Sequence, residues 1–190
     1  MDAVGSNIRI DARGGAVMRV LPVLNEEINE EWIADKARFA CDGLRRQRLD
    51  QPYVRHDGKL IPADWSEAFE AIAESVGATT NDRIAAIAGD LADCEAMTAL
   101  GDLMDALGSP HVDCRQDGAR IDAASRSGYL FNTTIQGIEQ ADACLLVGVN
   151  PRWEAPVLNA RIRKRYLTGQ TNIGLIGTKL DLTYKFQHLG

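Results

Sequence analysis

Residues 143–177 read ACLLVGVNPRWEAPVLNARIRKRYLTGQTNIGLIG, and this stretch decides the fold. Two short apolar runs, residues 143–148 and 172–177, flank a helical stretch at 156–167 that has a proline near its first turn. A strand, a helix and a second strand in this order form a βαβ unit, in which the two strands run parallel. The stretch therefore predicts an α/β protein.

The upstream sequence repeats this alternation of apolar runs and helical patterns. Further strands are predicted at 83–88 and 111–114, with a helix at 94–107 between them. The apolar stripe of that helix is expected in the core and consists of Met97, Leu100, Leu103, Met104 and Leu107. Another helix begins after Asp64, which forms a predicted capping box with Glu67, and we expect it to pack on the sheet. Together these elements predict a mainly parallel sheet with helices on both faces.

The first fifty residues differ from the rest in their pattern of apolar and polar residues. Alternating apolar residues on either side of Arg13-Gly14-Gly15 predict a small β-hairpin over residues 6–21, and residues 25–39 predict one or two short helices. A second hairpin is predicted at 52–62, with its turn on Asp57-Gly58. We therefore expect two domains, residues 1–50 and residues 51–190.

Composition excludes several classes of protein. The chain has 190 residues, of which 45% are hydrophobic and 25% charged, so it is not intrinsically disordered. Its 21 Lys and Arg against 27 Asp and Glu give a net charge of −6, which argues against nucleic acid as a partner. The longest apolar runs are too short to cross a bilayer, so direct membrane insertion is not expected. The four cysteines lack metal-site spacing and a secretory leader is not evident, so we expect reduced, mostly buried thiols.

The predicted strand ends are the first place to search for a ligand site, because open α/β sheets bind ligands outside the carboxyl ends of their strands. Gly89, Gly148 and Gly177 lie at such ends, but neither the dinucleotide-binding nor the P-loop glycine spacing is present. The loop after Gly148 places Asn150 and Glu154 at a strand end. Either these side chains bind a nucleotide, or they fix the loop and cap the following helix.

The other charged residues and the histidines do not indicate a class of enzyme. The basic run 161–165 holds four cations in five residues, which indicates either a solvated helix face or a contact for an acidic partner. His56, His111 and His188 have no catalytic partner that sequence spacing identifies.

Several segments, taken together in their order and spacing, resemble the molybdopterin oxidoreductase superfamily. Its general motifs are matched by Lys36-Ala37-Arg38-Phe39, Gly58-Lys59-Leu60, Trp65-x-Glu67-Ala68 and, above all, Ile138-Glu139-Gln140-Ala141-Asp142 leading into Leu145-Leu146-Val147-Gly148-Val149-Asn150-Pro151. A narrower likeness, to the large iron–sulfur (G-type) subunit of respiratory NADH:quinone oxidoreductase (complex I), comes from Asn25-Glu26-Glu27-Ile28-Asn29-Glu30-Glu31-Trp32-Ile33, Glu154-Ala155-Pro156 and Asn159-Ala160-Arg161-Ile162-Arg163-Lys164. The resemblance covers essentially the whole chain.

The departures from the superfamily pattern imply a dismantled cofactor site. Ala34 and Asp35 stand where relatives place a cluster-ligating cysteine. Relatives supply a molybdenum ligand from a later motif, which in this chain includes Gly118, and Cys114 falls too early in that motif to be the ligand. Gly177 is followed by Thr178 and Lys179 where relatives hold the guanosine of the pterin cofactor. We therefore expect no catalytic, metal or cofactor-binding residues, with Gly148, Asn150 and Glu154 as candidates for a vestigial pocket.

The resemblance implies a structural role in a respiratory electron-transport complex that carries electrons from NADH to quinone and pumps protons. Residues 1–50 would be the remnant of a 4Fe-4S domain of the molybdenum/tungsten bis-MGD type, and the expected 2Fe-2S and 4Fe-4S clusters would lie upstream of Met1 in a longer parent subunit. The expected partners are other subunits of the peripheral arm, on the cytoplasmic side of the bacterial inner membrane or the matrix side of the mitochondrial one. The alternatives are a molybdopterin-guanine-dinucleotide-dependent oxidoreductase domain and a nucleotide-binding module.

Overall fold

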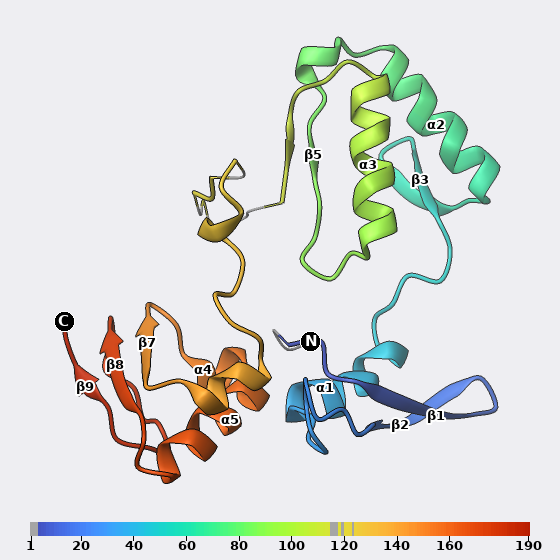
Figure 1. Ribbon diagram of the computed structural model, residues 1–190. Coiled ribbons are helices and arrows are strands. Elements are labelled where there is room, and N and C mark those ends of the chain that lie inside the picture. Colours follow the sequence, from blue (N-terminus) through green and yellow to red (C-terminus); the bar gives the residue numbers. More distant parts are fainter. Residues whose placement is uncertain (1–3, 115–117, 119, 123) are drawn as a thin grey trace. The chain divides into compact units, whose positions relative to one another are not determined.

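A computed structural model of the protein describes residues 4–114, 118, 120–122 and 124–190 (Figure 1). The chain forms two compact units. Unit 1 joins the described residues up to Gln47 with those from residue 124 onward, so it is built from both ends of the chain. Unit 2 is the intervening stretch, Arg48–Asp122. Each unit is described separately below.

The N-terminal part of unit 1 is an antiparallel hairpin followed by a short helical segment. Strands β1 (Ile8–Arg13) and β2 (Ala16–Pro22) pair across a turn at Gly14 and Gly15, whose positive φ angles of 55° and 74° suit glycine. Helix α1 (Asp35–Phe39) then runs into the 3₁₀ helix η1 (Ala40–Arg45). The hairpin predicted from the sequence is confirmed.

Residues 25–34 are not helical, which corrects the prediction of helices over 25–39. The side chain of Asn29 is fully buried and accepts a hydrogen bond from the Asn7 amide at 2.9 Å. Its amide nitrogen also lies 3.0–3.1 Å from the carbonyl oxygens of Val23, Glu30 and Trp32. A side chain that takes up the backbone groups of its neighbours competes with helix formation. Glu30, at φ 50°, has a left-handed conformation that a helix excludes.

The C-terminal part of unit 1 contains a three-stranded parallel sheet in the order β7-β8-β9. Its strands are β7 (Ala143–Val147), β8 (Asn172–Ile176) and β9 (Gln187–His188). The short helix α4 (Pro151–Glu154) and helix α5 (Pro156–Leu167) connect β7 to β8. Two 3₁₀ helices, η3 (Arg126–Gly128) and η4 (Gln136–Gln140), precede the sheet. The strand–helix–strand unit predicted for residues 143–177 is confirmed.

The core of unit 1 lies on one face of this sheet. Leu146, Ile173 and Leu175 point from β7 and β8 toward Ile138 of η4 and Ile162 of α5. The opposite face exposes apolar side chains, because Leu145 and Val147 are each 56% exposed and Ile176 is 40% exposed. The described residues of unit 1 therefore cover this face of the sheet less than the face that carries the core.

Unit 2 is an α/β arrangement with short strands. Strands β3 (Tyr53–His56) and β4 (Lys59–Pro62) form the predicted hairpin, and β5 (Ala86–Ile87) pairs in parallel with β6 (Val112–Asp113). Its helices are α2 (Trp65–Gly77), η2 (Asn81–Arg83) and α3 (Cys94–Ala106). β5 and β6 are both shorter than the predicted strands at 83–88 and 111–114.

Three expectations about packing in unit 2 are wrong in detail. Asp64 caps α2 by accepting from the Glu67 amide at 2.8 Å, but the Glu67 carboxylate lies 2.9 Å from His56 Nε2 instead of completing a capping box. The helix α2 was expected to pack on the sheet through its apolar residues, but only Ala68 of the helix is buried, while Trp65 is 66% and Phe69 is 60% exposed. In the predicted stripe of α3 only Met104 is buried.

The cysteines are free, as expected, but they are not buried. Cys94 and Cys114 are exposed, and Cys41 and Cys144 are half-buried.

The structure confirms the α/β class. The finer prediction, one mainly parallel sheet with helices on both faces, stays a prediction. Among the helices of the described residues, none combines the length and apolar character that crossing a membrane would require.

Truncation of the core of unit 1 should destabilise it strongly. Leu175 is 1% exposed, so we expect Leu175→Ala to lower the free energy of unfolding by about 2–5 kcal/mol, because it leaves a cavity. The matched control is Leu145→Ala on the other face of the neighbouring strand, which should cost about 0.5 kcal/mol. Urea denaturation of the chain measures both. Equal losses for the two variants would contradict the assignment of the core face.

Candidate functional site

The candidate site lies where β7 ends and the chain turns into α4. Gly148 has φ +61° and donates its amide to the Ile176 carbonyl at 2.9 Å, which places it beside the end of β8. Gly177 sits next to it, because a Cβ on Gly177 would lie 3.5 Å from the backbone of Gly148. Two of the three glycines predicted at strand ends are therefore neighbours, whereas Gly89 belongs to unit 2.

Asn150 and Glu154 cap the short helix α4 reciprocally. Asn150 Oδ1 accepts from the Arg152 amide at 3.2 Å, and the Glu154 carboxylate accepts from the Asn150 amide at 2.5 Å. Each side chain satisfies a backbone amide that the first turn of a helix leaves free. Of the two alternatives that the sequence leaves open, the structure shows the loop-fixing role for both residues.

Lys36 holds the other end of α4. Its Nζ donates to the carbonyl oxygens of Trp153 and Glu154, both at 3.0 Å, although Lys36 is 117 residues distant from Trp153 along the chain. A cation at the C-terminal end of a helix complements its unpaired carbonyls and the helix dipole. The lysine of the superfamily-like motif therefore fixes the strand-end loop.

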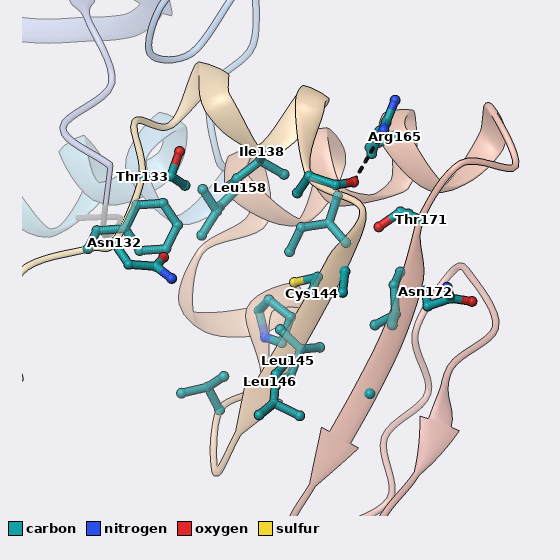
Figure 2. A pocket seen from close by; sticks show the side chains of 18 of the residues that line it. Asn132, Thr133, Ile138, Cys144, Leu145, Leu146, Leu158, Arg165, Thr171 and Asn172 are labelled. Carbon is teal, nitrogen blue, oxygen red and sulfur yellow. Dashed lines mark hydrogen bonds between the residues drawn. The ribbon is translucent and has the colours of Figure 1, made fainter.

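A cavity of about 1030 Å³ lies beside this loop (Figure 2). It is lined mainly by apolar residues of β7, β8 and α5, with polar side chains from Asn132, Thr133 and Asn172. Of the three residues predicted for a vestigial pocket, Glu154 lines it, while Gly148 and Asn150 are absent from its described lining. Arg165 also borders the cavity, but its Nε donates to the Ala141 carbonyl at 2.9 Å.

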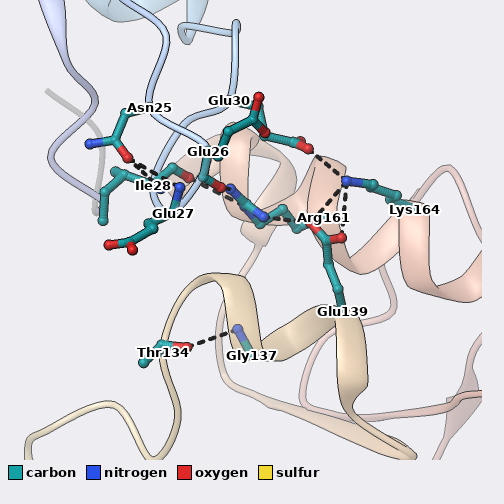
Figure 3. A network of polar contacts seen from close by, with 10 residues as sticks. All are labelled: Asn25, Glu26, Glu27, Ile28, Glu30, Thr134, Gly137, Glu139, Arg161 and Lys164. Atoms are coloured by element: carbon teal, nitrogen blue, oxygen red, sulfur yellow. Dashed lines mark hydrogen bonds and ion pairs between the residues drawn. The ribbon is translucent and has the colours of Figure 1, made fainter.

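A buried guanidinium joins the N-terminal segment to α5 (Figure 3). Arg161 is 1% exposed; its Nε donates to the Ile28 carbonyl at 3.3 Å and its Nη2 donates to the Glu26 carbonyl. Its Nη1 lies 2.5 Å from Glu139 Oε1. Lys164, one turn further along α5, pairs with Glu139 at 2.9 Å and with Glu30 at 2.6 Å.

These contacts shift two ionisation equilibria in the network. Burial would raise the pKa of Glu139, but hydrogen bonds and charge from Lys164 and Arg161 outweigh burial and lower it below 4.5. The hydrogen bonds that Lys164 donates to Glu30 and then to Glu139 raise the pKa of Lys164. Both shifts favour the charged forms, as expected for groups that face opposite charges.

The basic run 161–165 is solvated only in part, because Arg163 and Lys164 are exposed but Arg161 and Arg165 are not. Arg161 is buried, Arg165 is 13% exposed, and Lys164 is ion-paired within the chain. Their acidic partners are Glu30, Glu139 and Asp142 of unit 1 itself. Among the four cations, Arg163 is the exposed one without a salt bridge to the described residues.

The remaining candidate groups have structural surroundings. Burial raises the pKa of the Cys144 thiol, so it stays protonated at neutral pH. Burial, followed by the charge of Cys144, raises the pKa of Tyr184, whose hydroxyl donates to Asn159 Oδ1 at 2.7 Å.

Each of the three histidines has its own contacts within its unit. His56 pairs with Glu67 in unit 2, and His188 Nε2 lies 2.7 Å from the Gly177 carbonyl oxygen in unit 1. His111 contributes its backbone carbonyl to the Ala86 amide beside β6.

Asn29 and the role of Arg161 were missed by the sequence reasoning. Neither residue belongs to a motif with a known physical mechanism, and a run of Glu beside Asn looks like a helix start. The one available signal was the pairing of an acidic stretch, residues 26–31, with a basic stretch, residues 161–165, in one chain.

Family models match nearly the whole chain. The model for molybdopterin oxidoreductase matches residues 48–190, and the model described as "NADH-ubiquinone oxidoreductase NDSU1/NuoG-like, 4Fe-4S domain" matches residues 1–42. The chain therefore belongs to the molybdopterin oxidoreductase family, and the resemblance seen in the sequence is confirmed.

Curated relatives narrow the likeness to one kind of subunit. The chain is 52% identical over 189 residues to the G subunit of NADH-quinone oxidoreductase from Rickettsia conorii. It is 49% identical over 190 residues to mitochondrial NADH dehydrogenase [ubiquinone] iron-sulfur protein 1 of Solanum tuberosum, and 49% identical over 196 residues to the mitochondrial NADH-ubiquinone oxidoreductase 78 kDa subunit of Neurospora crassa. Each comparison covers 100% of this chain but only 26–28% of the relative. The chain thus spans about a quarter of their length.

The residues present do not fit an iron–sulfur cluster. A 4Fe-4S cluster is held by four thiolates, and Cys41 is the one cysteine in residues 1–42. Its Sγ lies 3.7 Å from the Arg38 carbonyl oxygen. Across the described residues, no three His, Cys, Asp or Glu side chains gather to hold a metal ion. The predicted molybdenum-ligand motif partly lies outside the described residues, at 115–117 and 119.

The Glu139 network should make stability depend on pH. Because the pKa of Glu139 is lowered in the folded state, its ionised form stabilises the protein above pH 4.5, and this contribution is lost as the pH falls through the lowered pKa. We expect Glu139→Gln to lower the free energy of unfolding most at neutral pH and progressively less in acid.

Urea denaturation between neutral and acidic pH measures this difference. The control is Glu27→Gln, an exposed neighbour of the network without a salt bridge to the described residues. If the loss in free energy of unfolding caused by Glu139→Gln stayed constant with pH, the lowered pKa of Glu139 would be contradicted.

Proposed function

We propose that the chain is a structural and docking part of the peripheral arm of an NADH:quinone oxidoreductase, with no redox centre of its own. The parent complex would transfer electrons from NADH to quinone and pump protons. The 2Fe-2S and 4Fe-4S clusters of the parent subunit would lie outside these 190 residues. Identities of 49–52% across the whole chain with G-type subunits support this proposal.

One structural observation carries the non-catalytic part of the proposal. The polar side chains at the family's strand-end site are occupied with holding the backbone: Asn150 and Glu154 cap α4, and Lys36 binds its last carbonyls. Groups committed to backbone contacts are not free to bind a pterin nucleotide. Gly148, Asn150 and Glu154 are therefore proposed as a vestigial pocket.

Location and partners follow from the same proposal. The partners would be other subunits of the peripheral arm. The arm would lie on the cytoplasmic side of the bacterial inner membrane or on the matrix side of the mitochondrial one. Residues 1–50 would be the remnant of the cluster domain and residues 51–190 the first part of the molybdopterin-like domain. A mainly parallel sheet with helices on both faces would be completed in the longer parent subunit.

Metal content tests the absence of a redox centre. We expect the purified chain to hold neither iron nor molybdenum in stoichiometric amount, measured by elemental analysis, and to show no visible absorption band of a cluster. Stoichiometric iron or molybdenum would overturn the proposal. Adding back iron and sulfide under reducing conditions serves as the control for loss of a labile cluster during purification.

A second candidate is a nucleotide-binding module, favoured by the cavity of about 1030 Å³ bordered by Glu154 and Asn172. If a guanine nucleotide binds there, a hundredfold excess over its Kd should stabilise the fold by about 2.7 kcal/mol. Thermal unfolding with and without GMP and GTP decides between the candidates. An unchanged Tm at millimolar nucleotide would discard the module.

A further inference from the structure

Two cations link the same two stretches of unit 1 in opposite directions. Lys36, from the N-terminal stretch, donates to the carbonyls of Trp153 and Glu154, both at 3.0 Å. Arg161, from the C-terminal stretch, donates to the carbonyls of Glu26 and Ile28. Each stretch therefore supplies a cation at one end and carbonyl oxygens at the other.

The two links close a ring in which the stretches run antiparallel. Ile28 lies against Arg161 and Lys36 lies against Trp153, so residues 28–36 and 153–161 are joined at both ends. The ion pair of Lys164 with Glu30 reinforces the Arg161 end (Figure 3). Between the links both stretches carry buried apolar residues, namely Ile33, Ala34, Ala155 and Val157. We call this ring the clasp.

We propose that the clasp is a conformational coupling device, through which the strand-end loop 148–156 and the N-terminal segment 25–36 open and close together. Lys36 is the positioning residue at its exposed end. When the link at one end is lost, the two stretches are joined only at the other end and form a longer, more mobile loop. The backbone amides on both sides of the clasp then lose protection against hydrogen exchange. This coupling is independent of the proposed function, because it needs neither a partner subunit nor a cofactor.

The coupling has a consequence for the cavity. Glu154 lines the cavity, and its carbonyl binds Lys36. Opening of the clasp therefore loosens one wall of the cavity as well as the N-terminal segment.

Amide hydrogen exchange of the 190-residue chain tests the coupling through Lys36→Met. One set of reporter amides lies on the loop side: Trp153 and Glu154 donate to the Asn150 carbonyl, and Ala155 donates to the Pro151 carbonyl. The other set lies on the segment side: Asn25 and Glu30 donate to each other's carbonyls, and Trp32 donates to the Asn29 carbonyl. We expect both sets to exchange roughly tenfold faster in the variant, because a charge-assisted link has been removed.

Three controls make the result decisive. Lys36→Arg keeps a cation and should restore slow exchange on both sides. Lys185→Met removes an exposed lysine that has no salt bridge among the described residues, and should leave both sets unchanged. Amides of β8, such as those of Ile173 and Leu175, should keep their protection in every variant.

Three results would overturn the proposal. If Lys36→Met speeds amide exchange on one side alone, the two stretches open independently. If it speeds exchange on neither side, Lys36 does not hold the clasp closed. If exchange also quickens throughout β7 and β8, the change reports unfolding of the whole sheet and not the opening of a clasp.

Discussion

The hydrogen bonds of one buried guanidinium hold unit 1 together. Arg161 donates to two backbone carbonyls of the N-terminal segment and to the carboxylate of Glu139, and almost none of its side chain reaches solvent. A buried charge is tolerated only where its donors are satisfied, because an unpaired one costs several kcal/mol. Arg161 therefore fixes where the segment lies, and with it the position of Lys36 against the end of α4.

The strand-end loop after β7 is held by contacts within unit 1, one of which comes from Lys36 of the N-terminal segment. In this loop the Asn150 and Glu154 side chains accept from backbone amides of the loop itself, and the Gly148 amide donates to the Ile176 carbonyl at the end of β8. The lysine of the superfamily-like motif reaches carbonyl oxygens of the same loop. Asn150 and Glu154 thus stabilise the loop, and Lys36 joins the loop to the N-terminal segment of unit 1.

Elements with local signals could be predicted from the sequence. The two hairpins have turn glycines, α2 has Asp64 at its N-terminus, and α5 has proline in its first turn, so their existence follows from short-range chemistry. Strands β7 and β8 were predictable as well, because their apolar runs flank a helical pattern, but the sequence did not indicate which face of the sheet carries the core. For Asn150 and Glu154, which follow the glycine at the end of β7, the sequence left two roles open: binding a nucleotide or fixing the loop. The structure shows the loop-fixing contacts.

The rest depends on contacts between residues far apart in sequence. Asn29 prevents a helix over residues 25–34 by binding the backbone of Asn7 and Val23, and no local pattern announces those partners. The burial of Arg161 follows from carbonyls more than 130 residues away, whereas a run of cations by itself indicates either a solvated face or a contact for an acidic partner. The strands β5 and β6 are shorter than their apolar runs because pairing, not composition, sets where a strand ends.

The free energy of unfolding of Arg161→Gln, compared with Arg163→Gln on the same helix, tests the central role of the guanidinium most directly. Arg161 is buried and Arg163 is exposed, so the two variants remove the same charge from different surroundings. The account predicts a loss of about 3–5 kcal/mol for Arg161→Gln and about 0.5 kcal/mol or less for Arg163→Gln. Equal, small losses for both variants would contradict it.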